Sequence, residues 1–341
     1  MHAAFERYET DPRRGLLCQL PAFQKLFLYA SDEIGATNWH WLKYHFQRLP
    51  PGLTAESIAS ALLDCEMQID DLGKFYLDQI ASIRDREKDE SDYQAILQIF
   101  GEIFALRQVF SLLWTAAPSF TREPAGQTGK RPELLVSSGP HRFLFEVKTP
   151  SLLDHQRMRS NRGIQIPGRA TSREMFETLS TEPMTLPRDN PIKDFLISAQ
   201  MKFSDFDALP GANLLIIVWD DHIYEPITAL MNQRSGLLTP DSYFRDKDGK
   251  TVVFPAVDGV IVLRHLNYFM SGLAERSLKD RLHLFDFGDD QALPNVFLPT
   301  PWGRPVPDFI LAGLRAYDYR DKDLSTMAEY HCQEVVLWIA V

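Results

Sequence analysis

The sequence predicts an α/β protein in which a mixed central sheet is flanked by helices and preceded by an N-terminal helical region. Two observations lead to this prediction. The first third of the chain repeats apolar residues at helical spacing, and from about residue 119 short β-type runs alternate with turns and one amphipathic helix. From Tyr93 onward the order is helix, strand, strand, strand, helix, strand, which is typical of helices layered on a small sheet.

The helical region is predicted to cover residues 1–91. Thr54 can cap a helix, and apolar residues then recur at steps of three and four. We therefore expect one unusually long amphipathic helix over 54–83, which would serve as core or as the surface of a homodimer. The charged run RDREKDES at 84–91 is expected to be a solvated turn, followed by a second helix that ends before Pro118.

Residues 92–341 are predicted to form the second domain. NPIKDFLISAQMKFSDF has an apolar stripe, a capping Asn and an early Pro, so residues 190–206 should be a helix. RDKDGK, at 245–250, is expected to be a hairpin turn. Strands are expected at 119–124, 133–138, 142–149, 213–219, 251–254, 257–263 and 334–341.

The composition excludes several classes of protein. Of 341 residues, 45% are hydrophobic and 24% are charged, which is ordinary for a globular chain. Three scattered cysteines, none in a CxxC pair, argue for a reducing compartment and against a zinc site. The start of the chain lacks the apolar core of a signal peptide, and no apolar run could span a bilayer. We expect a cytoplasmic protein with no membrane partner.

Charge is distributed unevenly along the chain. The net charge is −10, which counts against broad nucleic-acid binding, because phosphate contacts require Lys and Arg. The window from His141 to Arg173, however, has seven basic and two acidic residues and so carries +5. This basic segment is either a loop that faces nucleic-acid phosphates or a solvated linker. Its candidate phosphate contacts are Arg157, Arg159, Arg162 and Arg169.

One hairpin is expected to bring two carboxylates together. If Gly139-Pro140 is a two-residue turn, Ser138 pairs with His141. Counting outward along both strands then places Glu133 opposite Glu146, with their Cβ atoms about 5 Å apart. Because side chains alternate along a strand, Lys148 lies on the same face as Glu146.

This arrangement predicts a site for a hard cation. Facing carboxylates repel each other unless a cation or a proton lies between them. Mg²⁺, or Mn²⁺ in its place, suits such oxygen ligands, and the carbonyl of Val147 could add another. The ion could acidify a bound water, while Lys148 could orient that water and offset charge that develops on a phosphate.

RPELLVSSGPHRFLFEVKTP, at 131–150, resembles the core motif of the PD-(D/E)xK, or restriction-endonuclease-like, nuclease superfamily. The order of elements from about 93 to 219 is also similar to the core of that family. The resemblance implies metal-dependent hydrolysis of nucleic-acid phosphodiesters, with DNA favoured over RNA. It assigns Glu133 to the first acidic position, where Asp is more usual, Glu146 to the second metal ligand, and Lys148 to the catalytic lysine.

The resemblance also implies auxiliary residues on two helices. Glu102, in the helix that precedes the strands, matches an auxiliary acid. Gln200 or Lys202, in the later helix, matches an auxiliary polar position, and we expect Gln200 to be the catalytic one.

Two other interpretations remain open at this stage. Glu146 and Lys148 would form a solvated ion pair if they were surface residues, and Glu133 would then be a charge that protects a strand edge from aggregation. The domain could also be a catalytically inactive module with the same fold, which binds nucleic acid or a protein partner.

Overall fold

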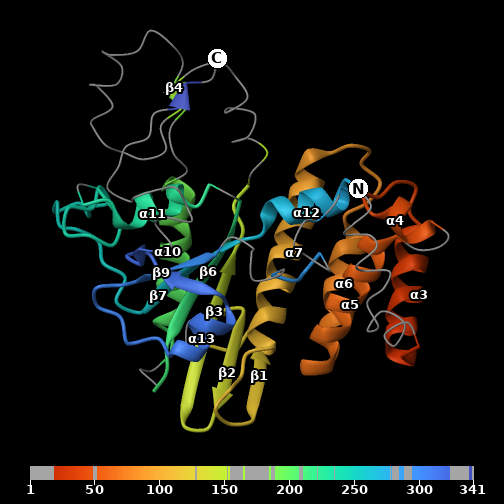
Figure 1. The fold of residues 1–341 in the computed structure, drawn as a ribbon, viewed down its shortest axis with the longest axis horizontal. Helices are drawn as coiled ribbons and strands as arrows, with labels where there is room; N and C mark the ends of the chain where they lie inside the picture. Colours follow the sequence, from red (N-terminus) through yellow and green to blue (C-terminus); the bar gives the residue numbers. More distant parts are fainter. Residues whose placement is uncertain are drawn as a thin grey trace. The chain divides into compact units, whose positions relative to one another are not determined.

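The computed structural model describes residues 19–48, 52–126, 129–151, 153, 164–165, 184–185, 189–206, 210–220, 222–233, 235–276, 278, 284–287, 294–322 and 338–339. The chain divides into two compact units (Figure 1). The helical unit comprises Met1–Leu112 and His265–Leu293, and the sheet unit comprises Leu113–Arg264 and Pro294–Val341. The first boundary, expected after residue 91, thus falls after Leu112, and a later segment rejoins the helical unit.

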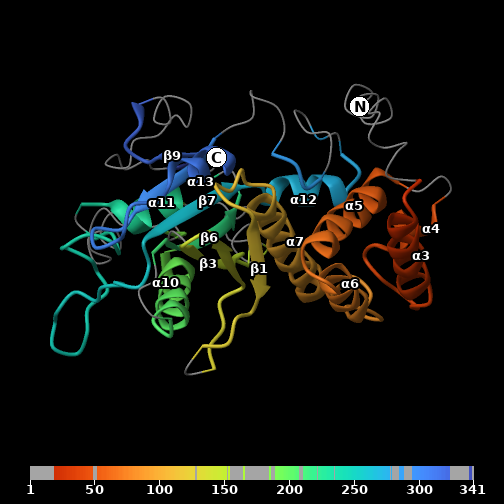
Figure 2. The same ribbon diagram turned by 90° about the horizontal axis from the view of Figure 1, so that it is seen from below.

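The helical unit is built around α5, which is buried on nearly all sides along its first three turns. Figures 1 and 2 show α5, α6 and α7 packed side by side. Burial on all sides places α5 at the centre of this unit, although its buried residues include polar ones such as Glu56 and Ser57. The helices of this unit are α3 (Pro21–Gly35), α4 (Lys43–Gln47), α5 (Leu53–Gln68), α6 (Leu72–Ser82), α7 (Glu90–Phe110) and α12 (Leu266–Leu273).

The single long helix predicted over 54–83 is wrong, because the chain breaks it into α5 and α6. Asp71 has a φ of 62°, a left-handed conformation that Asp tolerates better than most residues. The Glu66 carboxylate accepts hydrogen bonds from the backbone N–H groups of Asp71 and Lys74, which lie at the start of α6. The apolar spacing continues across the break because both helices bury residues in the same core.

Helix α7 and the turn before it are confirmed. The Asp89 side chain accepts a hydrogen bond of 2.8 Å from the Ser91 N–H and so caps the first turn of α7. The charged run at 84–91 supplies this turn and the cap. Along α7, Phe100, Ile103 and Phe104 are fully buried.

The predicted fold class, α/β with a mixed central sheet flanked by helices, is confirmed. Among the described residues, the main sheet of the sheet unit has seven strands, in the order β1-β2-β3-β6-β7-β8-β9. The β1–β2, β2–β3 and β7–β8 pairs are antiparallel, whereas β3–β6, β6–β7 and β8–β9 are parallel. The strands are β1 (Pro118–Arg122), β2 (Leu134–Ser138), β3 (His141–Lys148), β6 (Asn213–Trp219), β7 (Gly259–Arg264), β8 (Asn295–Pro299) and β9 (Ala316–Asp318).

Helix α10 (Asp189–Phe203) covers one face of the sheet together with α11 (Tyr224–Met231). From α10, Leu196, Ala199 and Phe203 join a core that includes Leu144 of β3 and Leu215 of β6. Glu146 and Lys148 lie at even positions of β3, like Leu144, so they lie on the face that α10 covers. The packing of α10 therefore decides which of its side chains reach them.

The later part of the chain differs more from expectation. The strand predicted at 251–254 is reduced to one bridge, from Thr251 to Arg245, at the base of the predicted turn. Of the strand predicted at 334–341, the structure describes Trp338–Ile339 (β10), which pairs with β4 (Ile164–Gln165), itself paired with β5 (Met184–Thr185). Helix α13 (Asp308–Gly313) was not predicted, nor were α11, α12, β8 and β9. None of the helices in the described part of the chain is long and apolar enough to cross a membrane.

Candidate active site

The β2–β3 hairpin has the register that its turn predicts. Ser138 pairs with His141 and Leu134 pairs with Phe145. Gly139 opens the turn with a φ of 59°, which glycine adopts without steric strain. Glu133 directly precedes Leu134, and Glu146 directly follows Phe145, so both residues lie just beyond the last β2–β3 pair of this ladder.

Glu146 is the most deeply placed charged residue of this group. It lies in β3, between β2 and β6, and its side chain has an exposed fraction of 0%. The ammonium of Lys148, two residues further along β3, lies 2.6 Å from Glu146 Oε1. Lys148 is 24% exposed and ends the strand, so this cation faces outward from the buried acid.

Lys202, in the last turn of α10, completes the group. Its Nζ lies 2.7 Å from Oε1 of Glu146 and donates a hydrogen bond of 2.9 Å to Oε2. The same Nζ lies 3.5 Å from Oε1 of Glu133. Two carboxylates and two ammonium groups therefore converge, and we call Glu133, Glu146, Lys148 and Lys202 the carboxylate–lysine cluster.

The electrostatics of the cluster reflect its burial. Burial and then the charge of Glu146 raise the pKa of Glu133, and the two lysines only partly offset this. Burial alone would lower the pKa of Lys202, but Glu146 and then Glu133 outweigh it, so that this pKa lies above its usual value. The two acids thus repel each other, and Lys202 is the cation held between them.

The donor atoms of the cluster suit a hard divalent cation. Mg²⁺ is usually held in proteins by one or two carboxylates and keeps several waters, so Glu133 and Glu146 are a sufficient protein contribution. Among the described residues, no group of three or more His, Cys, Asp or Glu side chains could hold a metal, so any site here rests on these two acids. The side chain of Val147 is buried within β3, and the role of its carbonyl stays a prediction.

Gln200 has a different partner from the one expected. Its side-chain oxygen accepts a hydrogen bond of 2.9 Å from the backbone N–H of Ala256, so it anchors the segment that leads into β7. Each residue of an α-helix is turned by about 100° from the one before, so residues i and i+2 are about 200° apart around the axis. Gln200 and Lys202 therefore flank the apolar stripe on opposite sides. The stripe alone predicts neither as the residue that meets β3. The family resemblance offers Lys202 only as an alternative to Gln200, and it is Lys202 that reaches the carboxylates.

The remaining predicted residues lie in the helical unit or outside the described part of the chain. Glu102 is part of α7 and belongs to the helical unit. Arg157, Arg159, Arg162 and Arg169 lie outside the described residues. Their roles stay predictions.

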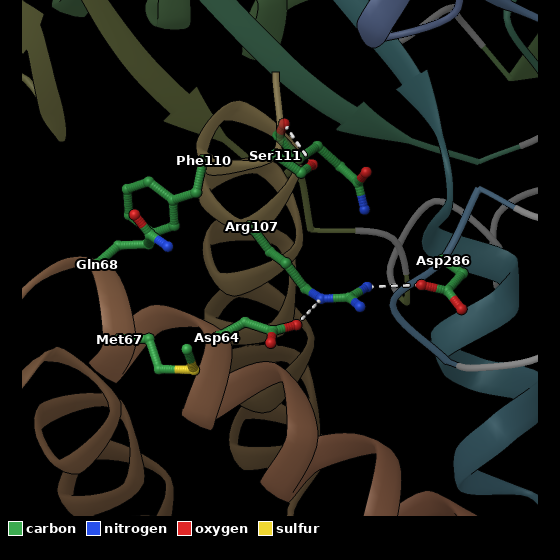
Figure 3. Close-up of a pocket in the computed structure, with 8 residues that line it drawn as sticks. Asp64, Met67, Gln68, Arg107, Phe110, Ser111 and Asp286 are labelled. Atoms are coloured by element: carbon green, nitrogen blue, oxygen red, sulfur yellow. Dashed lines mark hydrogen bonds and ion pairs between the residues drawn. The ribbon is translucent and has the colours of Figure 1, made fainter. Parts of the chain in front are cut away.

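The helical unit contains a pocket of about 390 Å³, which is lined by none of the residues of the carboxylate–lysine cluster (Figure 3). Arg107, on α7, projects into it and lies 2.6 Å from Asp64 and 2.7 Å from Asp286. Its Nη1 also donates a hydrogen bond to the carbonyl of Phe285. The guanidinium thus joins α5, α7 and the segment 284–287. These contacts assign Arg107 a structural role, because they hold three segments of the helical unit together.

Comparisons of the chain with models of protein families, with curated proteins and with solved structures found no match.

Proposed function

We propose that the protein is a metal-dependent nuclease that hydrolyses nucleic-acid phosphodiester bonds at the carboxylate–lysine cluster. The observation that carries the proposal is the position of Glu146. A fully buried carboxylate is costly, and a second partly buried carboxylate beside it adds repulsion. Apolar residues would stabilise this part of the sheet better, so the charges are better explained by chemistry than by stability.

Each member of the cluster has a role that follows from its place. Glu133 and Glu146 would hold Mg²⁺, which when bound supplies a polarised phosphoryl oxygen and an acidified water. Lys148 lies at the end of β3, and its side chain is 24% exposed. It would bind a non-bridging phosphate oxygen, orient the attacking water and offset the charge that builds up as the P–O bond breaks.

The order of elements supports the same proposal. Helix α7, strands β1, β2 and β3, helix α10 and strand β6 occur in this order along the chain, with the short strands β4 and β5 between β3 and α10. The order resembles that of the PD-(D/E)xK superfamily, which the 131–150 motif also resembles. The basic segment between His141 and Arg173 favours a polyanionic substrate, and DNA is preferred over RNA on the resemblance alone.

One observation favours a second candidate, a non-catalytic module that binds nucleic acid or a protein. Two lysines already lie beside the two carboxylates, so the charges balance without a metal ion. In that case the cluster would only fix α10 against β3, and no divalent ion would bind.

A substrate panel separates the two candidates. The purified chain is incubated with single- and double-stranded DNA and RNA, in Mg²⁺, in Mn²⁺ and in excess chelator. The proposal expects cleavage of at least one substrate, only with a divalent ion, and none by Lys148→Ala. Lys193→Ala is the matched control, because Lys193 is on α10 but pairs with Asp194 at the other end of that helix. No cleavage of any substrate would favour the binding module.

A further inference from the structure

Lys202 and Lys148 carry the same charge but hold different positions in the carboxylate–lysine cluster. Among the described residues, Lys202 is the lysine found within 4 Å of both carboxylates. Lys148 forms its ion pair with Glu146 alone. Lys202 therefore bridges Glu133 and Glu146, whereas Lys148 caps Glu146 from the strand end.

A bridging position between two carboxylates is also where a divalent ion would bind. Mg²⁺ needs ligand oxygens at about 2.0–2.1 Å. Oε1 of Glu146 already has the Lys202 ammonium at 2.7 Å, so a metal ligated by that oxygen and by Glu133 would lie against this ammonium. Like charges at such a distance repel strongly in a buried site. The ion and the bridging ammonium cannot share the position.

The Lys202 side chain can leave the bridge without unfolding α10. It sits in the last turn of the helix and is 20% exposed, so its flexible stem begins near solvent. The C-terminal end of a helix is electronegative, which favours a cation that stays near the end of α10. The released ammonium thus has an alternative place close by.

We propose that Lys202 is a built-in competitor for the divalent ion, so that metal binding requires its ammonium to leave Glu133 and Glu146. Lys202 thereby sets the metal concentration at which the site fills and keeps the two carboxylates neutralised until then. This inference rests on the proposed metal-dependent function. It adds to that function a residue that determines metal affinity.

Metal binding by full-length variants tests the inference without any cleavage assay. Mn²⁺ affinity is measured by calorimetry for the wild type, Lys202→Met, Lys148→Met and Lys202→Arg. Both Met variants remove one positive charge, so the difference between them isolates the bridging position. Lys202→Met should bind Mn²⁺ about tenfold more tightly or better, which is the scale of one charge-assisted hydrogen bond. Lys148→Met should tighten Mn²⁺ binding less than Lys202→Met does, because Lys148 pairs with Glu146 alone whereas Lys202 pairs with both carboxylates.

Lys202→Arg is the second variant, since it keeps the neutralising charge and so should fold even if Lys202→Met does not. A guanidinium can pair with both carboxylates through several N–H groups, so it should be harder to displace. Mn²⁺ binding should then be weaker than in the wild type, and this result alone would support the inference.

Each other outcome overturns a defined claim. Equal tightening in Lys202→Met and Lys148→Met would mean that charge alone matters, and displacement would be wrong. Unchanged affinity in Lys202→Met, or unchanged or tighter binding in Lys202→Arg, would overturn the inference and leave the metal site standing. No Mn²⁺ binding by the wild type or any variant would overturn the proposed function and the inference together.

Discussion

The ammonium of Lys202 donates a hydrogen bond of 2.9 Å to Glu146 Oε2, although 56 positions separate the two residues in the chain. This contact joins the last turn of α10 to β3, an interior strand of the sheet. Because Glu133 directly precedes β2, three elements contribute to one pair of carboxylates, of which Glu146 is fully buried and Glu133 is partly exposed. The site therefore depends on the packing of α10 as much as on the hairpin.

Replacing Glu133 should stabilise the metal-free protein. Glu133→Gln removes the repulsion from Glu146 while keeping the shape of the side chain, and Lys202 keeps its closer partner. We expect the free energy of unfolding at neutral pH to rise by about 1 kcal/mol, as when other destabilising functional residues are replaced. Chelator-treated samples are compared by urea titration. A clear loss of stability would mean that Glu133 is a structural partner of Lys202.

Arg107 should contribute strongly to the stability of the helical unit. Arg107→Lys cannot reproduce the interactions with Asp64, Asp286 and the Phe285 carbonyl, because an ammonium lacks the planar fork of a guanidinium. Urea unfolding should show that the free energy of unfolding falls by roughly 2 kcal/mol or more. Arg84→Lys is the control: Arg84 is 53% exposed with an ion pair of 3.9 Å, and its replacement should change stability by no more than about 0.5 kcal/mol. If Arg107→Lys and Arg84→Lys changed the free energy of unfolding equally, the structural role of Arg107 would be contradicted.

His40 should make the helical unit less stable in acid. Burial lowers its pKa from the ordinary 6.5, despite the Ile80 carbonyl and nearby acids. Its Nε2 hydrogen-bonds to the Ile80 carbonyl and its Nδ1 accepts from the Leu42 N–H, so both nitrogens are used in the neutral ring. Below pH 6.5 the unfolded chain gains a proton that the folded ring resists, so stability falls as the pH falls.

The melting temperatures of the wild type and His40→Gln between pH 7.5 and 5 check this point. At pH 7.5 the wild type should have the higher melting temperature. The difference in melting temperature should shrink below about pH 6.5, because Gln does not titrate. A difference in melting temperature that stays constant over this pH range would show that His40 is protonated equally in the folded and unfolded states.

The basic segment should act by neutralising phosphates. Replacing Arg157, Arg159, Arg162 and Arg169 with Ala should weaken binding to all DNA sequences alike. The slope of log affinity against log salt should become shallower by about 0.9 for each phosphate that the variant no longer neutralises. Fluorescence anisotropy over a salt series measures both. Arg320→Ala, far along the chain and paired with Asp318, is the control. An unchanged slope would identify the segment as a linker.

The hairpin could be predicted because a two-residue turn leaves no freedom in register. Once Gly139 forms the turn, every later pair follows as far as Leu134 and Phe145, which leaves Glu133 and Glu146 just beyond the last pair. Strand β6 could be predicted from its unbroken apolar run, and α10 could be predicted from its apolar stripe at helical spacing. These features are local, and local sequence determines them.

The remaining differences depend on side-chain interactions and strand pairings that the apolar spacing does not reveal. The break between α5 and α6 needs the Glu66 carboxylate at the start of α6, and the apolar spacing runs through it unchanged. The choice between Gln200 and Lys202 depends on how α10 is rotated against β3, which its own stripe does not fix. The short strands β8 and β9 depend on edges supplied by other strands, since β8 pairs with β7 and β9 pairs with β8.

The central claim is that Glu146 holds a metal ion and Lys148 acts on the phosphate. The most direct measurement pairs Mn²⁺ calorimetry with cleavage assays on the wild type, Glu146→Gln and Lys148→Ala. We expect the wild type to bind the ion and cut. Glu146→Gln should do neither, because a neutral amide binds a hard cation poorly. Lys148→Ala should bind the ion almost normally and fail to cut. A wild type that neither binds nor cuts, or two variants that still cut at the wild-type rate, would contradict the claim.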